Sequence, residues 1–195
     1  MNTPIPETTI YAWHFVADKL RDGRPAPADG VTLEHLGPLK LCNSGLHASR
    51  DAFDALRYAP GDTLCLVRCE GKVIEGDDKL VCSKRTIVAR MDAAPLLYYF
   101  ARMQALSALD RYPGNPDQVV LDWLMTGDES LRSAARSTAF SAGDSAAYSA
   151  AYSAAASAAY SAAASAAYSA AASVAASAAG EEFNALVRDA FADWL

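Results

Sequence analysis

The stretch 43–49, Asn-Ser-Gly-Leu-His-Ala-Ser, holds the residues of this sequence that are best suited to chemistry. It lies between a predicted strand and a predicted helix, and the N-terminus of a helix can offer backbone amides to an anion. Side chains from the first predicted strand and from the end of the longest one could converge on the same place. We therefore predict a ligand-binding site formed by His14, Ser44, Gly45, His47, Ser49 and Glu75.

Several of these residues also have a purely structural interpretation. His47 could only brace the loop, Gly45 could only supply a positive φ, and Ser49 could only cap the following helix. No Walker loop, dinucleotide fingerprint, HExxH or GxSxG motif occurs in the sequence. We therefore assign no catalytic residue.

Cysteine usage and charge limit the classes of function. Four cysteines, Cys42, Cys65, Cys69 and Cys82, raise the question of zinc or disulfides, but none forms a C-x-x-C pair. We expect buried, reduced thiols, no bound metal and a cytoplasmic location. The formal net charge is −6, without a basic patch, which argues against nucleic acid as a partner. The N-terminal residues do not resemble a secretory signal, and we expect no membrane association.

Residues 1–92 predict a compact α+β domain with a small mixed β-sheet and one or two helices. Runs rich in β-branched and aromatic residues predict strands at 9–17, 31–34, 39–42, 63–70, 80–83 and 86–91. Gly71-Lys72 and 75–78 are predicted turns between strands. The helix after Ser49 should end at Pro60-Gly61.

The rest of the chain predicts an all-helical region. Residues 93–143 read as a helical connector, with an apolar stripe that includes Leu97, Phe100 and Leu109. Serine then recurs at every fourth position from Ser133 to Ser177, separated mostly by alanine and tyrosine. Alanine is the strongest helix former, so we predict one long Ala/Ser/Tyr-rich helix. Silk-like strands, a membrane span and an ice-binding helix are the alternatives.

Segment 144–195 combines this repeat with a C-terminal amphipathic helix that starts after Gly180. Small residues allow close approach of helices, and exposed apolar surface usually marks an interface. We therefore predict a homo-oligomer that associates through a coiled arrangement of these helices. The predicted association residues are Tyr148, Tyr152, Tyr160, Tyr168, Phe183, Phe191 and Trp194.

Four segments carry a family resemblance: YAWHF, LCNSGLHAS, ALRYAPGDTLCLVRCEG, and GDDKLV followed by KRTI. They resemble a domain of unknown function that occurs in phages, prophages and bacteria, over roughly 9–92. Similar proteins often continue into Ala-rich helical repeats. A weaker resemblance, carried by the aromatic-His strand and the G-L-H-A-S loop, is to ADP-ribosyltransferase-like folds. It implies a pocket with His14, His47 and Ser49 for NAD or a related nucleotide, although no Q-x-E or E-x-E pair follows.

Three hypotheses of function result. The favoured one is a non-enzymatic binding or interaction protein of phage or prophage type. Its N-terminal domain would bind a small ligand or a host protein, and its Ala-rich helix would mediate self-association without a cofactor. The second is an ADP-ribosyltransferase-like transferase that uses a nucleotide. The third is a structural component of a filament or virion.

Overall fold

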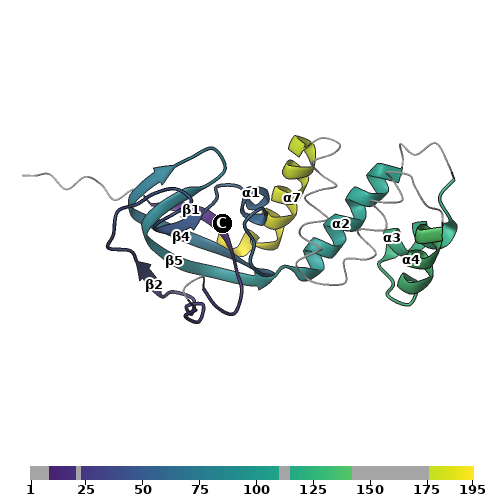
Figure 1. The fold of residues 1–195 in the computed structure, drawn as a ribbon, viewed down its shortest axis with the longest axis horizontal. Helices are drawn as coiled ribbons and strands as arrows, with labels where there is room; N and C mark the ends of the chain where they lie inside the picture. Colours follow the sequence, from purple (N-terminus) through teal and green to yellow (C-terminus); the bar gives the residue numbers. More distant parts are fainter. Residues whose placement is uncertain (1–8, 21–22, 110–114, 142–175) are drawn as a thin grey trace, which may run out of the picture. The chain divides into compact units, whose positions relative to one another are not determined.

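The computed structural model describes residues 9–20, 23–109, 115–141 and 176–195 of the chain (Figure 1). The chain divides into two units. Unit 1 consists of Met1–Asp92 and Phe183–Leu195, and unit 2 consists of Ala93–Glu182. The C-terminal end therefore joins the N-terminal domain, whereas the sequence analysis grouped it with the repeat.

Unit 1 is built on an antiparallel sheet. Its described strands are β1 (Ile10–Val16), β2 (Thr32–Glu34), β3 (Leu46–Ala48), β4 (Thr63–Glu75) and β5 (Leu80–Asp92). The strand order is β1-β4-β5-β2, and β3 pairs with the beginning of β5. All pairings among these strands are antiparallel, so the predicted mixed sheet is wrong, while the α+β content is confirmed.

Strands β4 and β5 form one long hairpin instead of the shorter pieces that the sequence suggested. The predicted turn at Gly71-Lys72 is a β-bulge inside β4, where Gly71 adopts a φ of 75° and the pairing register shifts. The Lys72 amide donates to Ser83 Oγ at 2.9 Å, which holds the bulge against β5. The chain reverses only at Gly76, whose amide donates to the Lys79 carbonyl at 2.8 Å.

The segment before α1 also differs from the prediction. The predicted strand 39–42 is absent: residues 41–43 form a tight turn, closed by backbone hydrogen bonds between Lys40 and Ser44. Part of the predicted loop is instead the short strand β3. The Ser49 backbone forms a bridge with Trp13, so the end of β3 returns to β1 and the sheet curls.

The curled sheet encloses an apolar core. One of its faces carries Ile10, Ala12, Val16, Cys65, Val67, Cys69, Cys82 and Ile87, which cluster with Ala48 and Leu80. The register places His14 opposite Cys65, and Arg85 opposite Cys69, so both polar residues belong to this same face. We call it the His14 face. Cys65, Cys69 and Cys82 are buried as expected, but Cys42 is exposed.

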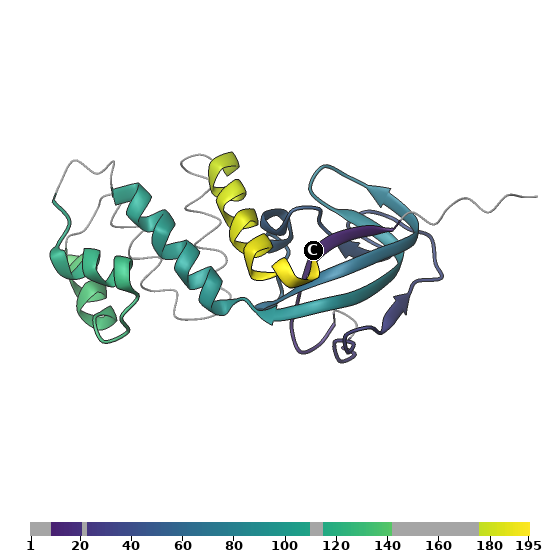
Figure 2. The ribbon, with the colours of Figure 1, turned by 180° about the vertical axis from the view of Figure 1, so that it is seen from behind.

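The other face of β1, the Trp13 face, is covered by the end of the chain. The helix α7 (Ala176–Ala190) and a short 3-10 turn (Ala192–Trp194) bring Phe191 against Trp13, with ring centroids 5.0 Å apart. Figures 1 and 2 show the C-terminal part of α7 beside α1 (Ala52–Leu56) and the sheet. Phe183 packs against Phe53 of α1 at 6.0 Å. Gly180 lies inside α7, so the predicted boundary there is wrong.

Unit 2 contains the helices α2 (Ala94–Leu109), α3 (Gln118–Thr126) and α4 (Arg132–Ser141). They share a core of Ala105, Leu109, Val120, Trp123, Leu124 and Ala135. Gly127 ends α3 in the left-handed conformation, with a φ of 70°, as a C-terminal glycine does in many helices. The described residues that follow Asp92 are thus helical in α2, α3 and α4.

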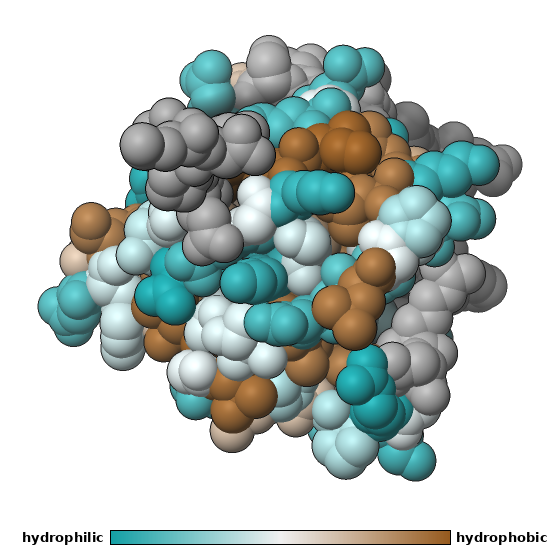
Figure 3. All heavy atoms as spheres, turned by 90° about the vertical axis from the view of Figure 1, so that its left-hand side faces the viewer, coloured by the Kyte–Doolittle hydropathy of each residue, from teal (hydrophilic) through white to brown (hydrophobic). Residues whose placement is uncertain are grey.

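The predicted repeat helix and its four tyrosines lie outside the described residues. Phe183 and Phe191 are buried in unit 1, whereas Trp194 is exposed. Within the described ranges, no helix has the length and apolar character needed to cross a bilayer. On the face of the molecule in Figure 3, hydrophobic residues appear as separate patches between hydrophilic ones.

Candidate functional site

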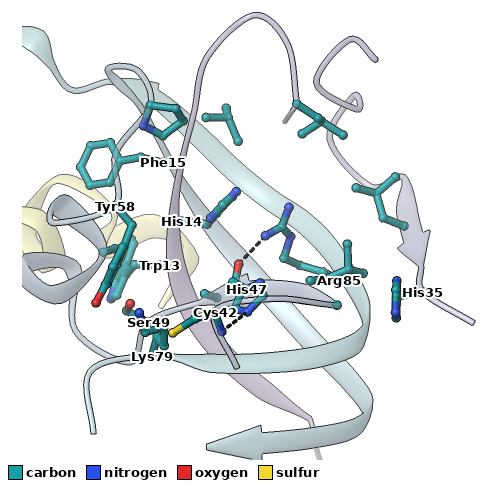
Figure 4. Close-up of a pocket in the computed structure, with 18 of the residues that line it drawn as sticks. Trp13, His14, Phe15, His35, Cys42, His47, Ser49, Tyr58, Lys79 and Arg85 are labelled. Carbon is teal, nitrogen blue, oxygen red and sulfur yellow. Dashed lines mark hydrogen bonds between the residues drawn. The ribbon is translucent and has the colours of Figure 1, made fainter. Parts of the chain in front are cut away.

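A cavity of about 910 Å³ lies in unit 1 (Figure 4). Its wall is formed by β1, β3, the turn before β3, part of β5 and the segment after α1. Five of the six predicted ligand residues line it: His14, Ser44, Gly45, His47 and Ser49. Glu75 is not among its lining residues. The cavity also has aromatic residues in its wall, namely Trp13, Phe15 and Tyr58.

His14 is the most informative of the predicted residues. Its imidazole is partly buried in the cavity wall and points toward the space beside Arg85 (Figure 4). Among the described residues it has no hydrogen-bond partner. Burial, followed by the nearby positive charges of Arg85 and His47, holds the pKa of His14 well below its usual value. The ring is therefore neutral near pH 7.

Arg85 is a cavity residue that the sequence analysis missed. It is 6% exposed, and its Nη1 donates a hydrogen bond to the His47 carbonyl. The groups that act on it electrostatically are the thiols of Cys69, Cys82 and Cys65. No described carboxylate forms an ion pair with its guanidinium. Arg85 lies in the polar run Ser83-Lys84-Arg85-Thr86, where the sequence predicted a break between two strands, so its place on a sheet face could not be inferred.

His47 has a bracing role that the structure explains. Cys42 has a positive φ of 63°, and its amide donates to His47 Nε2 at 3.1 Å. That nitrogen must be unprotonated to accept, so the neutral ring carries its proton on Nδ1. Burial lowers the pKa of His47, which agrees with this state. The Nε2 atom of His47 is therefore used in a hydrogen bond to the turn before β3.

Ser44 and Gly45 shape the same turn. The Ser44 hydroxyl donates to the Pro38 carbonyl at 2.8 Å and therefore accepts from His35 Nε2 at 3.0 Å. Gly45 has a φ of 115°, and a Cβ there would lie 2.4 Å from a Val81 methyl group. Both residues thus hold the cavity wall in place.

Ser49 and Glu75 do not play the roles that were predicted for them. The Ser49 backbone pairs with Trp13, and the N-cap of α1 is Asp51, so Ser49 is not the cap. Glu75 forms an exposed, bidentate pair with Arg50 at 2.8 and 3.1 Å. This ion pair lowers the pKa of Glu75.

A second polar cluster borders the cavity at Tyr58 and Lys79. The Lys79 ammonium lies 3.7 Å from the centroid of the Tyr58 ring, and the Tyr58 hydroxyl donates to Asp78. Lys79 and Asp78 are also 3.9 Å apart. The hydrogen bond to Tyr58 raises the pKa of Lys79, so it is charged at neutral pH.

The described residues of the cavity wall have an unusual charge balance. They include Lys19, Arg24, Lys79 and Arg85, but neither aspartate nor glutamate. The whole chain carries a formal charge of −6. Positive charge is thus concentrated in one cavity of an acidic protein, where low-dielectric walls strengthen its field.

The fold and the cavity define unit 1 as an antiparallel α+β domain with a basic, partly aromatic internal site. Residues 10–98 match the family model described as "Domain of unknown function (DUF7666)". This match covers the whole sheet and confirms that this part of the chain is an uncharacterised domain. Comparison with curated proteins and with solved structures gives no match.

Proposed function

We propose that unit 1 is a non-enzymatic binding module that holds a small molecule in its cavity. The observation that carries this proposal is the cavity of about 910 Å³, whose wall combines aromatic rings with the imidazole of His14, which has no hydrogen-bond partner among the described residues. Pockets of a few hundred to 1,000 Å³ with a few convergent polar groups are typical of small-molecule sites. Five of the six residues that the sequence suggested as ligand contacts line this same cavity, which supports the proposal.

A binding role agrees better with the side chains than a transferase role does. Glu75, the acidic residue predicted at the site, is paired with Arg50 on the surface. His47 is held by the amide of Cys42, and the described cavity wall offers no carboxylate as a general base. The pocket is therefore suited to recognition by hydrogen bonds, charge and aromatic contact.

The test makes the same change, leucine to tryptophan, at one position in the cavity wall and at one position on the surface. Leu33→Trp enlarges a side chain of the cavity wall, whereas Leu36→Trp changes a side chain that is 95% exposed. The full chain is screened by thermal shift with nucleosides, nucleotides including NAD, sugar phosphates, carboxylic acids and amides. A ligand at ten times its Kd adds about 1.4 kcal/mol, or about 3–6 °C in Tm.

We expect at least one compound to raise the Tm of the wild type and of Leu36→Trp, but not that of Leu33→Trp. An equal response of both variants would place the binding elsewhere. A wild type that responds to no compound would contradict the proposal.

We further propose that segment 144–195 associates copies of the chain, as the repeat suggests. Because Phe183 and Phe191 belong to the core of unit 1, truncation before α7 would damage the fold. The suitable variant replaces Tyr148, Tyr152, Tyr160 and Tyr168 with alanine in the full chain. Light scattering coupled to size exclusion should show an oligomer for the wild type and smaller species for the variant. A monomeric wild type would contradict this part.

A further inference from the structure

The guanidinium of Arg85 is buried and has no carboxylate partner among the residues that the structure describes. It is 6% exposed, and its described hydrogen bond goes to the neutral carbonyl of His47. A guanidinium has five N–H donors in a planar fork, so this bond uses one of them. The neighbouring groups on the His14 face are apolar side chains and the thiols of Cys65, Cys69 and Cys82.

Such an arrangement is costly for the protein alone. Buried charges are normally paired, because removal from water costs several kcal/mol for each ion. Three acidic residues of neighbouring elements are engaged elsewhere: Asp29 with Arg90, Glu75 with Arg50, and Asp78 with Lys79 and Tyr58. The chain thus supplies cations to the cavity and keeps these carboxylates outside it.

The second independent observation is His14. Its ring lies on the same sheet face as Arg85, points into the same space, and has no hydrogen-bond partner among the described residues (Figure 4). An imidazole can donate one hydrogen bond and accept another. Together, Arg85 and His14 offer a fork of donors and a further polar group toward one point in the cavity.

We propose that the ligand of this cavity is an anion whose phosphate or carboxylate group is bound by Arg85, with His14 as its second contact. This inference rests on the proposed function and adds the chemical class of the ligand. Arginine matches the geometry of both oxyanions through two parallel N–H···O bonds. Lys79 and Lys19 in the same wall favour the approach of an anion.

The experiment uses three groups of probes on the full chain. The phosphate group is pyrophosphate and AMP, the carboxylate group is citrate and benzoate, and the neutral group is adenosine and benzamide. Thermal shift and isothermal titration are carried out at constant ionic strength, set with sodium chloride. If the phosphate probes bind more tightly than the carboxylate probes, the ligand's oxyanion is a phosphate. The reverse order identifies a carboxylate.

Three variants assign the effect to Arg85. Arg85→Met removes the charge with little change in volume, Arg85→Lys keeps the charge but loses the fork, and Arg50→Met applies the same change to an arginine outside the cavity. We expect either the phosphate probes or the carboxylate probes to bind wild type and Arg50→Met with the same Kd. The Kd of these probes should rise at least tenfold in Arg85→Met and by less in Arg85→Lys.

Three results would overturn the inference. If anions bind wild type and Arg85→Met equally, Arg85 only anchors the His47 carbonyl. If only the neutral probes bind, the small-molecule function stands and the anionic assignment fails. A wild type that binds none of the probes contradicts the proposed function and this inference together. If Arg85→Met does not fold, the inference is tested by the Kd of Arg85→Lys and by the comparison of anionic with neutral probes on the wild type.

Discussion

Two successive residues of β1 show opposite ways of burying a side chain. Trp13 meets Phe191 from α7 at 5.0 Å, and the chain itself closes that face. His14 lies on the other face beside Arg85, where a neutral ring borders a buried guanidinium, and the described residues give neither of them a carboxylate partner. Trp13 also borders the cavity, but its face contributes mainly stability, whereas the His14 face keeps polar groups available for a ligand.

The difference teaches where function should be sought in an uncharacterised domain. Polar groups that face a cavity and have no described protein partner there can bind a ligand, as a few convergent polar groups do in small-molecule sites. Apolar contacts on the Trp13 face need no ligand to explain them, since burial alone accounts for them. If this comparison is correct, substitutions on the two faces have different consequences, which the following predictions test from the largest expected effect to the smallest.

The largest effect is expected for Phe191→Ala. Phe191 is 1% exposed and contacts both Trp13 and Trp194. Removing a buried phenyl ring leaves a cavity and costs about 3–5 kcal/mol of unfolding free energy. Urea unfolding of the full chain measures this loss. Trp194→Ala, at an exposed position, should cost less than about 1 kcal/mol. A small loss for Phe191→Ala would show that the C-terminal end does not stabilise unit 1.

Asn184 offers a test of intermediate size. Its Oδ1 accepts from the Phe53 amide at 2.9 Å, and its Nδ2 donates to Asp51 Oδ1 at 3.2 Å. Helix α1 has no cap from its own N-cap side chain, so Asn184 takes over that role from a distant part of the chain. Asn184→Ala should cost about 1–2 kcal/mol, as cap removal does. Asn115→Ala, at an exposed position of unit 2, is the matched control and should have little effect.

The polar loop around His47 predicted residues that lie together: five of the six predicted site residues line one cavity. That they bind a ligand stays a prediction. The sheet was harder to predict. The bulge at Gly71 could not be distinguished from a turn, since glycine with a positive φ serves both. Lys84-Arg85 read as a strand break, because burial of an arginine opposite Cys69 depends on tertiary context.

The C-terminal helix illustrates a second limit. Its apolar face predicted a docking surface, but spacing along a helix does not reveal whether the partner is the same chain or another copy. Phe183 and Phe191 find their partners Phe53 and Trp13 in unit 1. Gly180 suggested a boundary, yet α7 runs through it, and the packing of Phe183 and Phe191 outweighs a propensity cost of about 1 kcal/mol.

The pH dependence of stability should reveal His14. Its pKa is lowered in the folded state, mainly by burial and then by Arg85 and His47. Below about pH 6.5 the unfolded chain takes up a proton that folded His14 resists, so stability is full above that pH and falls as the pH decreases. Tm measurements between pH 8 and 5 should show this decrease, and His14→Gln should reduce it.

The remaining slope in His14→Gln has an identified source. His47 also has a lowered pKa, from burial and from the charges of Arg85 and Lys79, and it titrates in the same direction. The double change His14→Gln with His47→Gln should flatten the curve further. An anion bound to Arg85 should also flatten it in the wild type, because negative charge favours protonated His14. Equal curves for wild type and His14→Gln would show that His14 is not a buried neutral base.

The smallest change in unfolding free energy is expected for Arg85→Met, although the burial of Arg85 alone would predict a large one. Arg85 is nearly as buried as Phe191, so a purely structural role would make Arg85→Met costly in the absence of a ligand. The substitution removes an uncompensated charge and keeps an apolar stem against the core, which offsets the lost hydrogen bond to the His47 carbonyl. We expect the unfolding free energy of ligand-free protein to change by less than about 1 kcal/mol. A loss similar to that of Phe191→Ala would make Arg85 the anchor of β3 and erase the contrast between the two faces.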